Sequence, residues 1–392
     1  MTFSIPKGEY ENHVARVQNM MEENNLDAIL CYANENTYSN VHYLTRYRPL
    51  FEVGGALLGR TGAPLVLIGG EAPEFAGMGP FGMETVRACE GFGHPYGGGK
   101  IKGWEGVRFY TLEELFDEVT KGKGVKRLGL PDLGILPKFL YDKIKASCPP
   151  DTELVDCYEE MDTIRMLKTE WETEMVRQAS LISEKAFDSA LGKITPEMTE
   201  FELEGLLAAE IYKHGGEGNS FPIMCYSGYR SRMGIGRSTH NKLGRDTIIN
   251  IDIGAHFGGY ASEYGRPIIF GKMSDQTKRE IDFVLDLHDK LVNEWVKPGV
   301  TAGSIYARYY DAFVDNGWGP PPASASHGIG IFEGEAPPFR RDIPTVLVPG
   351  ITAASDHFFR SKEYGFRFSD IYRITETGTE LFTKSHWEYI EL

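Results

Sequence analysis

The sequence predicts two domains, an α/β domain in the first part of the chain and a larger α+β domain after it. The chain has 392 residues, more than one hydrophobic core usually supports. Helical patterns alternate with short apolar strands over residues 1–155. Over residues 156–392, strand pairs with Gly-rich turns are interleaved with amphipathic helices. These patterns place the domain boundary near residue 155.

In the first domain, three stretches indicate regular elements. "YENHVARVQNMMEENNLDAILCYA" (10–33) predicts an amphipathic helix, a short turn and a buried strand. "GALLGRTGAPLVLIGG" (55–70) predicts a hairpin around a Gly-Pro turn. "YTLEELFDEVTKGKGVKRLGLPD" (110–132) predicts a helix that stops at glycine, followed by another strand.

In the second domain, a segment of helical character at residues 158–194 leads into a mixture of helices and paired strands. Helices are expected near 198–214, 275–297 and 302–316, and strand or hairpin segments at 221–228, 247–254, 260–270 and 366–375.

The composition restricts the partners that this protein can have. The chain is 41% hydrophobic and 25% charged, with a mean hydropathy of -0.30, as is typical of soluble globular proteins. A net charge of -15 argues against nucleic acid or an anionic membrane surface as a partner. No stretch approaches the roughly 18 apolar residues of a membrane span. A small molecule is therefore the expected partner.

The start of the chain and the cysteines indicate the compartment. "MTFSIPKGEYENHVARV" has no basic start followed by an apolar run, so no secretory signal is expected. Five scattered cysteines without CxxC spacing fit reduced thiols better than a disulfide framework or a zinc site. We expect a cytoplasmic protein.

The hairpin "IINIDIGAHFGGYASEYGRPIIFG" (248–271) carries two acids in an apolar setting. Asp252 and Glu263 are surrounded by isoleucines, which indicates that both carboxyl groups are buried. Buried carboxylates are costly unless they are paired, hydrogen-bonded or bound to a cation. The hairpin is therefore the first candidate for a site, with Asp252 expected to orient the turn or to pair with a basic neighbour.

Three further segments could converge on this hairpin. "GRSTHNKLGRD" (236–246) carries His240, and "SASHGIGIFEGEAPPF" (324–339) carries His327 before a Gly-Ile-Gly turn that allows close backbone approach. "TVLVPGITAASDHFF" (345–359) carries Asp356 and is followed by "YGFRFSDIYRITETGTELFT".

The order and spacing of these four segments resemble the creatinase–prolidase superfamily, whose "pita-bread" fold is shared with methionine aminopeptidases. "IRMLKTEWETEMVRQA", "LVPGI" and "TETGTELFT" are also similar to that family. The resemblance covers most of residues 155–392, and the first domain is similar more loosely. It implies a pita-bread C-terminal domain (156–392) preceded by a smaller creatinase-type N-terminal α/β domain (1–155), an α+β protein as a whole.

The resemblance also implies which residues correspond to the five metal ligands of the family's peptidases, two Asp, one His and two Glu. Position by position, these correspond to Asp252, Glu263, His327, Asp356 and Ser369, with Gly334 in place of a later His before Glu335. A serine hydroxyl is a poor neutral substitute for the carboxylate that bridges both ions. The family's two-ion centre is therefore expected to be absent, and no cofactor is expected.

A single divalent cation at Glu263, His327 and Asp356 stays open as an alternative. One His with two carboxylates can hold such an ion. The changed side-chain lengths at 263 and 356 amount to about 1.5 Å, whereas coordination distances tolerate only about 0.2 Å. The backbone would have to move to bring these three ligands to one ion.

Within the superfamily, the site pattern resembles creatinase, the metal-free branch. "THN" at 239–241 is similar to its catalytic His followed by Asn, which corresponds to His240. "FRRDIPTVLVPG" implies a carboxylate clamp at Arg340 with Arg341 beside it, and "RYRPLF" implies that Arg48 reaches the site of a partner subunit in a homodimer. The connection before His240 is longer than in creatinase, and Gly265 stands at a creatinase Glu position, so a different substrate is expected.

These observations predict metal-independent hydrolysis of a C–N bond in a small carboxylate-bearing amidine or amide. The expected catalytic residues are His240, His327, Glu263 and Asp356, and the expected substrate-binding residues are Arg340, Arg341, Arg48, Asp252 and Glu335. One His can take a proton from water and return it to nitrogen, and Arg suits planar carboxylate recognition. The alternatives are a single-metal Xaa-Pro dipeptidase, an ectoine-hydrolase-like enzyme or a lyase of this fold, and a non-catalytic ligand-binding homologue.

Overall fold

The computed structural model describes residues 6–70, 73–93 and 107–392, and the start of the N-terminal stretch examined for a secretory signal lies outside them. The chain divides into two compact units, Met1–Arg165 and Met166–Leu392. This boundary lies ten residues after the expected residue 155 because the helix α6 (Tyr158–Met166) is bonded to the first unit. The Arg16 guanidinium, for example, donates to the carbonyl oxygen of Ile164 at 2.7 Å.

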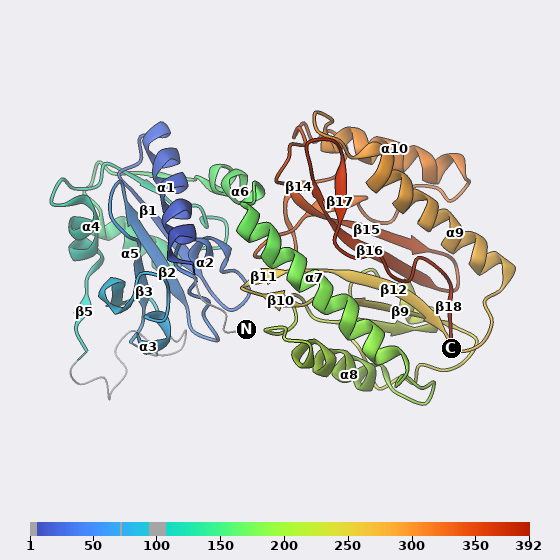
Figure 1. Ribbon diagram of the computed structural model, residues 1–392. Coiled ribbons are helices and arrows are strands. Elements are labelled where there is room, and N and C mark those ends of the chain that lie inside the picture. Colours follow the sequence, from blue (N-terminus) through green and yellow to red (C-terminus); the bar gives the residue numbers. More distant parts are fainter. Residues whose placement is uncertain (1–5, 71–72, 94–106) are drawn as a thin grey trace. The chain divides into compact units, whose positions relative to one another are not determined.

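The first unit is built on one mixed sheet (Figure 1). Its strands are β1 (Ala28–Ala33), β2 (Gly54–Gly59), β3 (Leu65–Ile68), β4 (Val86–Cys89), β5 (Phe109–Tyr110), β6 (Arg127–Gly129) and β7 (Glu153–Val155), in the order β5-β4-β3-β2-β1-β6-β7. β2 pairs antiparallel with both β1 and β3. The predicted hairpin at 55–70 and the buried strand after the first helix are confirmed.

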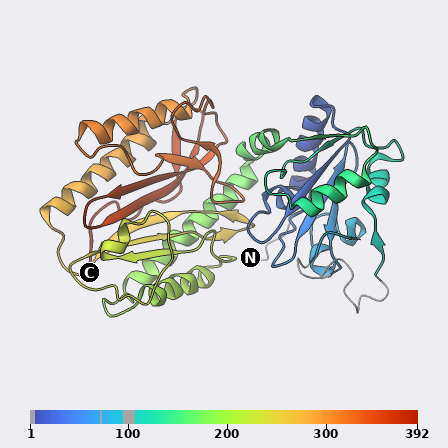
Figure 2. The ribbon, with the colours of Figure 1, turned by 180° about the vertical axis from the view of Figure 1, so that it is seen from behind.

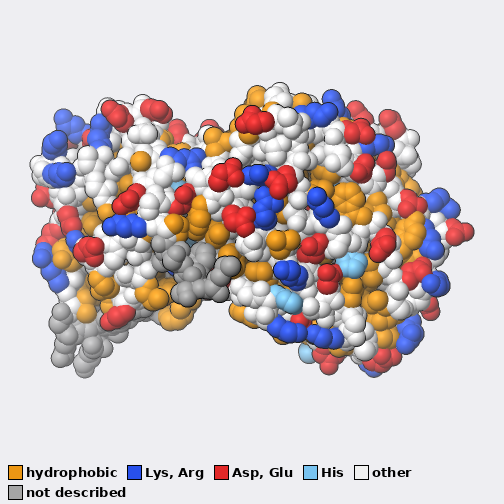
Figure 3. Space-filling view, in the orientation of Figure 1, with side chains coloured by type: hydrophobic (Ala, Val, Ile, Leu, Met, Phe, Trp, Pro, Cys, Tyr) orange, Lys and Arg blue, Asp and Glu red, His pale blue; other side chains and the backbone are white. Residues whose placement is uncertain are grey.

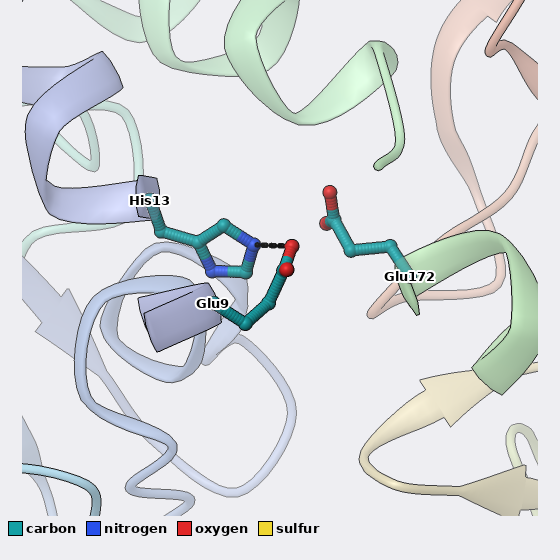
Figure 4. A group of neighbouring side chains, drawn as sticks. All are labelled: Glu9, His13 and Glu172. Carbon is teal, nitrogen blue, oxygen red and sulfur yellow. Dashed lines mark ion pairs between the residues drawn. The ribbon is translucent and has the colours of Figure 1, made fainter. Parts of the chain in front are cut away.

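Helices cover both faces of this sheet, as expected for an α/β unit. They are α1 (Lys7–Glu23), α2 (Ser39–Thr45), α3 (Pro73–Ala76), α4 (Leu112–Thr120), α5 (Lys138–Ser147) and α6, with a 3₁₀ turn η1 (Met83–Thr85). α1 lies over one face (Figure 1) and α5 over the other (Figure 2). Leu115 and Ile144 of α4 and α5 belong to the same buried cluster as Leu30 of β1. On α1, Glu9 and His13 form an ion pair of 3.3 Å one turn apart (Figure 4).

The second unit is built on a larger sheet. Its strands are β8 (Met224–Ser227), β9 (Ile248–Ile253), β12 (Tyr264–Ile269), β13 (Ser326–Gly328), β14 (Glu335–Pro338), β15 (Thr352–Arg360), β16 (Gly365–Ile374), β17 (Thr379–Leu381) and β18 (Ile390–Glu391). The order is β14-β13-β15-β16-β12-β9-β8, with β17 beside β16 and β18 beside β12. β10 (His256–Phe257) and β11 (Tyr260–Ala261) form a separate ribbon. The predicted strands at 247–254, 260–270 and 366–375 are confirmed, whereas β15 was not predicted.

The helices of the second unit also follow the predicted segments. They are α7 (Glu170–Leu191), α8 (Glu200–Lys213), α9 (Asp275–Lys290) and α10 (Ala302–Asp315), with the 3₁₀ turn η2 (Gly228–Arg232) and the π-helical turn η3 (Leu291–Trp295) after α9. α7 begins with a capping box between Thr169 and Glu172, which satisfies exposed backbone groups of the first turn. Glu172, drawn in Figure 4, also accepts a hydrogen bond from the Tyr260 hydroxyl at 2.9 Å.

The alternation of side chains along the central strands separates a helix-covered face from a polar face. On β9, Ile249, Ile251 and Ile253 belong to the buried cluster formed with α7 and α8. Successive side chains of a strand point to opposite faces, so Asp252 lies on the other face. On β16, Phe366 and Phe368 belong to the cluster formed with α9 and α10. Arg367 and Ser369, which alternate with these phenylalanines, therefore share the polar face with Asp252.

The surface shows both signs of charge. In the space-filling view, Lys and Arg side chains are intermingled with Asp and Glu side chains over this face of the protein (Figure 3). In residues 6–70, 73–93 and 107–392, no helix has the length and apolar character that a membrane span requires.

Candidate active site

A row of four residues crosses the polar face of the second sheet. Asp252 of β9 stands opposite Gly265 of β12, Gly265 opposite Ser369 of β16, and Ser369 opposite Asp356 of β15. Residues directly opposite one another on neighbouring strands point to the same side of the sheet. The register therefore brings the two acids of this row onto one face, with a glycine and a serine between them.

His327 of β13 faces this row together with two glutamates. Its Nε2 lies 3.2 Å from Glu263 Oε2, 3.4 Å from Glu333 Oε1 and 4.0 Å from Asp356 Oδ2. The other ring nitrogen, Nδ1, lies 3.0 Å from the carbonyl oxygen of Gly328. A carbonyl can only accept, so Nδ1 carries a hydrogen and Nε2 is the nitrogen directed at the acids.

The acids keep the His327 ring charged. Burial alone lowers the pKa of this ring, but the hydrogen bond and charge of Glu263, followed by the charges of Glu333 and Asp356, raise the pKa to about 10. The His327 side chain remains 16% exposed. These charges favour the imidazolium form of His327, which can donate a proton.

Arg367 of β16 is the second cation of the cluster, and sequence reasoning missed it. Its Nη1 lies 3.1 Å from Asp252 Oδ2 and 3.7 Å from Glu263 Oε1, and its Nε lies 3.2 Å from Asp356 Oδ1. Burial by itself lowers the pKa of the guanidinium, but the charges of Asp356, Asp252 and Glu263 outweigh this effect and hold the pKa above its usual value. The expectation that Asp252 pairs with a basic neighbour is thus confirmed.

Mutual repulsion and burial weaken the acidity of the carboxyl groups. Burial raises the pKa of Asp252, and the charge of Glu263 raises it further. Burial likewise raises the pKa of Glu263 to about 7, with Asp356 as the next cause, although His327 opposes the shift. A carboxyl group whose pKa lies near neutrality can exchange a proton at physiological pH, as a general base must.

The expected substrate-binding residue Glu335 is bound to other groups of the protein. Both oxygens of the Glu335 carboxylate are engaged: Oε2 lies 3.2 Å from Lys168 Nζ, and Oε1 accepts from the backbone N–H of Phe332 at 3.2 Å. The glutamate that lies near His327 is Glu333, two residues earlier in the same turn. Sequence analysis did not single out Glu333, because the two glutamates of "FEGE" cannot be distinguished by spacing alone. The substrate-binding role of Glu335 stays a prediction.

His240 is not brought together with the acids. It is exposed, and its ring packs edge-on against Phe201 with 4.9 Å between centroids. The preceding residue, Thr239, is hydrogen-bonded to Glu200, which also accepts from the backbone N–H of Ser227. Ser227 pairs with Ile249, three residues or about 10 Å of extended strand from Asp252. The catalytic role of His240 stays a prediction.

Each of the three expected carboxylate-clamp arginines is exposed or contacts an aromatic ring within its own unit. Arg340 and Arg341 are exposed, and the guanidinium of Arg341 lies 4.6 Å from the centre of the Tyr310 ring. Arg48 belongs to the first unit, where its guanidinium lies 4.4 Å from the centre of the Tyr38 ring. Their substrate-binding roles stay predictions.

The sheet of the second unit and its polar face of one histidine and several carboxylates belong to a known family of hydrolytic enzymes. Residues 174–376 match the model of Metallopeptidase family M24, and residues 13–167 match the Creatinase/Prolidase N-terminal domain. The chain belongs to metallopeptidase family M24 and is a hydrolase that acts on C–N bonds. The predicted superfamily and the predicted types of both domains are confirmed.

Three proteins that are similar to this chain are peptidases by name. An Xaa-Pro dipeptidase of Pyrococcus horikoshii is 27% identical over 381 residues, covering 96% of this chain and 98% of that protein. The solved structure of an X-Pro aminopeptidase from Thermotoga maritima has a TM-score of 0.82 at 22% identity, covering 97% of this chain and 99% of that one. An Xaa-Pro dipeptidase from Bacillus anthracis has a TM-score of 0.80 at 24% identity, covering 98% and 100%. These relatives favour the peptidase alternative over the creatinase-like interpretation.

The two-ion centre of the family does not fit the residues of this site. An ion would have to lie about 2.0–2.2 Å from the ligand oxygens. Positively charged nitrogens of Arg367 already lie 3.1 to 3.7 Å from oxygens of Asp252, Glu263 and Asp356, so the ion would sit close to a second positive charge. Two unit charges 4 Å apart repel by about 4 kcal/mol at an effective dielectric constant of 20, and a divalent ion doubles this to about 8 kcal/mol. Ser369 adds no charge to offset the repulsion.

The candidate ligands for a single ion differ from the expected set. Ligand atoms of Glu263, His327 and Glu333 all lie within 4.8 Å of one another. Asp356, the third ligand expected from the sequence, has its Oδ1 3.2 Å from Arg367 and its Oδ2 4.0 Å from His327. Glu333 therefore takes the place of Asp356 in the set that could hold one ion.

Proposed function

We propose that this protein hydrolyses the amide C–N bond of a dipeptide or a similar small compound that carries a carboxylate. The observation that carries the proposal is the convergence of Glu263, Glu333 and Asp356 on the Nε2 atom of His327, at 3.2, 3.4 and 4.0 Å. It supplies the base and the acid that hydrolysis of an amide requires. The peptidase names of the relatives support an amide as the bond that is cleaved.

The proposed reaction uses a carboxylate and the imidazolium in sequence. The carboxylate of Glu263 takes a proton from water while the water oxygen forms a bond to the carbonyl carbon. His327 gives its Nε2 proton to the nitrogen as the C–N bond breaks, which releases a neutral amine. The proton held by Glu263 then returns to His327 across their 3.2 Å contact, so that both groups regain their starting states.

The reaction in this proposal needs no metal ion, because Arg367 already supplies a fixed positive charge beside three carboxylates. A single-metal dipeptidase is the second candidate, favoured by the set Glu263, His327 and Glu333 with its ligand atoms within 4.8 Å. In that case the ion would supply a Lewis acid, and the same side chains would hold it.

A substrate panel tests the proposed reaction. Xaa-Pro and other dipeptides, creatine-like compounds and ectoine-like compounds are incubated with the protein, and release of a new amine is measured. We expect release from a dipeptide, and a loss of about 10²–10⁴-fold when Glu263 is changed to Gln, which cannot accept the proton. Release only from an amidine or a cyclic compound would contradict the amide assignment, and ligand-induced stabilisation without turnover would contradict the enzymatic one.

We also propose a homodimer in which Arg48 holds the substrate carboxylate in the partner's site. The support is the resemblance of "RYRPLF" to the corresponding creatinase loop. Changing Arg48 to Ala should raise KM about 10–100-fold with little change in kcat, because a hydrogen bond to a charged group contributes about 1.5–3 kcal/mol. Light scattering gives the mass at the same time. A monomeric mass with activity unchanged by dilution would contradict the dimer.

A further inference from the structure

We propose that Arg367 takes the place of the metal ions of this family, so that its guanidinium is a built-in cation that closes the site to divalent ions. Its nitrogens lie 3.1, 3.2 and 3.7 Å from oxygens of Asp252, Asp356 and Glu263, the three acids that correspond to metal ligands. One side chain thus lies within ion-pair distance of carboxylates from three separate segments, and it donates a hydrogen bond to Asp252 at 3.1 Å.

The neighbouring residues leave the space that this guanidinium needs. A Cβ atom on Gly265 would lie 3.2 Å from Arg367 Cγ and 2.6 Å from Ser369 Oγ. A side chain at position 265 would therefore crowd the stem of Arg367, and a longer acid at position 369 would crowd the same row. The small, neutral residues Gly265 and Ser369 leave room beside them for the side chain of Arg367.

The arginine is fixed at several points along its length. Its backbone N–H donates to Asn250 Oδ1 at 2.7 Å, and its Nη2 donates to the carbonyl oxygen of Gly234 at 3.2 Å. The side chain is only 8% exposed. Because the backbone and the far end of the side chain are both held, the guanidinium cannot easily swing into solvent to admit an ion.

The charge of Arg367 offsets part of the cost of keeping the acids together in a buried position, while Asp252, Glu263 and Asp356 each leave an oxygen without a hydrogen-bond partner among the described residues. Unpaired buried carboxylates are strongly unfavourable, and Asp252 and Glu263 are both fully buried. The acids that correspond to metal ligands therefore have a positively charged partner in Arg367. Among the described residues, the ion pairs of His327 with Glu263 and Glu333 do not include Arg367. Arg367 is a positioning residue in this account.

Metal binding by equilibrium dialysis against Mn²⁺ and Zn²⁺ tests the proposal. The wild-type protein should bind neither ion stoichiometrically. Arg367→Met keeps an unbranched apolar stem but removes the charge, and it should bind at least one ion about 100-fold or more tightly than the wild type, because a repelling charge has been removed. Arg367→Lys keeps the charge and should resemble the wild type.

The matched control is Arg373→Met on the same strand. Arg373 pairs with Glu170 and with Glu380, so this variant also removes an arginine from two carboxylates, and it should gain no metal. Stoichiometric binding by the wild type would overturn the proposal even if Arg367→Met failed to fold. A folded Arg367→Met protein, verified by circular dichroism, that binds no more metal than the wild type would also overturn it. Because these measurements need no turnover, they are independent of the proposed reaction.

Discussion

Changing His327 to Ala should lower kcat by about 10²–10⁴-fold on whichever amide the panel identifies, the usual cost of removing a general acid or base. When the acids are ionised, the ring nitrogen directed at Glu263, Glu333 and Asp356 supplies the proton for the leaving nitrogen. KM should change much less than kcat, because the lost interaction acts on the breaking C–N bond in the transition state. Steady-state kinetics on the purified variant measure both constants.

His386→Ala is the matched control for this variant. It removes a histidine that also faces a carboxylate, with Nε2 2.6 Å from Asp188 Oδ1, but from a partly exposed pair outside the acid cluster. Its kcat should stay within about threefold of wild type, the scatter expected when no catalytic group is lost. His240→Ala separates the two candidate histidines. If His240→Ala abolished turnover while His327→Ala retained it, the assignment of the acid made from the contacts would be wrong.

Changing Asp370 to Asn should lower the free energy of unfolding of the second unit by about 3–5 kcal/mol, as is typical when one partner of a buried ion pair is removed. Arg266 donates to both oxygens of Asp370, at 2.8 and 3.0 Å, and neither side chain is exposed. The guanidinium lies 4.0 Å from the centres of the Tyr264 and Phe368 rings. The variant would leave it buried without its negative partner.

The pH dependence of this pair has a defined sign. Burial raises the pKa of Asp370, but Arg266 and then His288 lower it below its usual value. The contribution of the pair is therefore complete above the pKa of the unfolded chain, about 3.9, and is lost as the pH falls through the lower folded pKa. The stabilities of wild type and Asp370→Asn should begin to converge below about pH 4 and should meet only below the folded pKa of Asp370.

Urea denaturation followed by circular dichroism measures the loss. The control is Arg177→Met, which removes an arginine from the partly exposed pair with Glu380 and should cost no more than about 1 kcal/mol. The double variant Arg266→Met with Asp370→Leu should recover part of the loss, since replacing both buried charges by apolar groups removes the uncompensated one. Equal effects of Asp370→Asn and Arg177→Met would contradict the central role of this pair.

The parts of the fold that sequence analysis predicted correctly are those in which the residue pattern has one physical explanation. The isoleucines around Asp252 and Glu263 require burial, and both acids are indeed fully buried. The Gly-Pro turn between two apolar runs requires a hairpin, which β2 and β3 form. β15 escaped prediction because its small, polar and aromatic residues, "TAASDHFFR", show neither an apolar run nor a clean alternation.

Arg367 could not be separated from an ordinary surface arginine by sequence alone. The pattern "GFRFSD" alternates apolar and polar residues, which usually indicates a strand with one face in solvent. In the structure that face carries the site, and the register with Gly265 and Asp356 directs Arg367 toward the acids. The sequence held one signal for this role: Arg367 stands two residues before Ser369, so the two side chains lie on the same face of the strand.

The most direct test of the account is the turnover of the wild-type protein on its panel substrate after exhaustive treatment with EDTA. If Arg367 supplies the positive charge of the site and His327 with Glu263 carries the proton transfers, kcat/KM should be the same before and after treatment, and added Mn²⁺ or Zn²⁺ should not increase it. Loss of activity in EDTA that a divalent ion restores would contradict the account and would favour a metal ion at Glu263, His327 and Glu333.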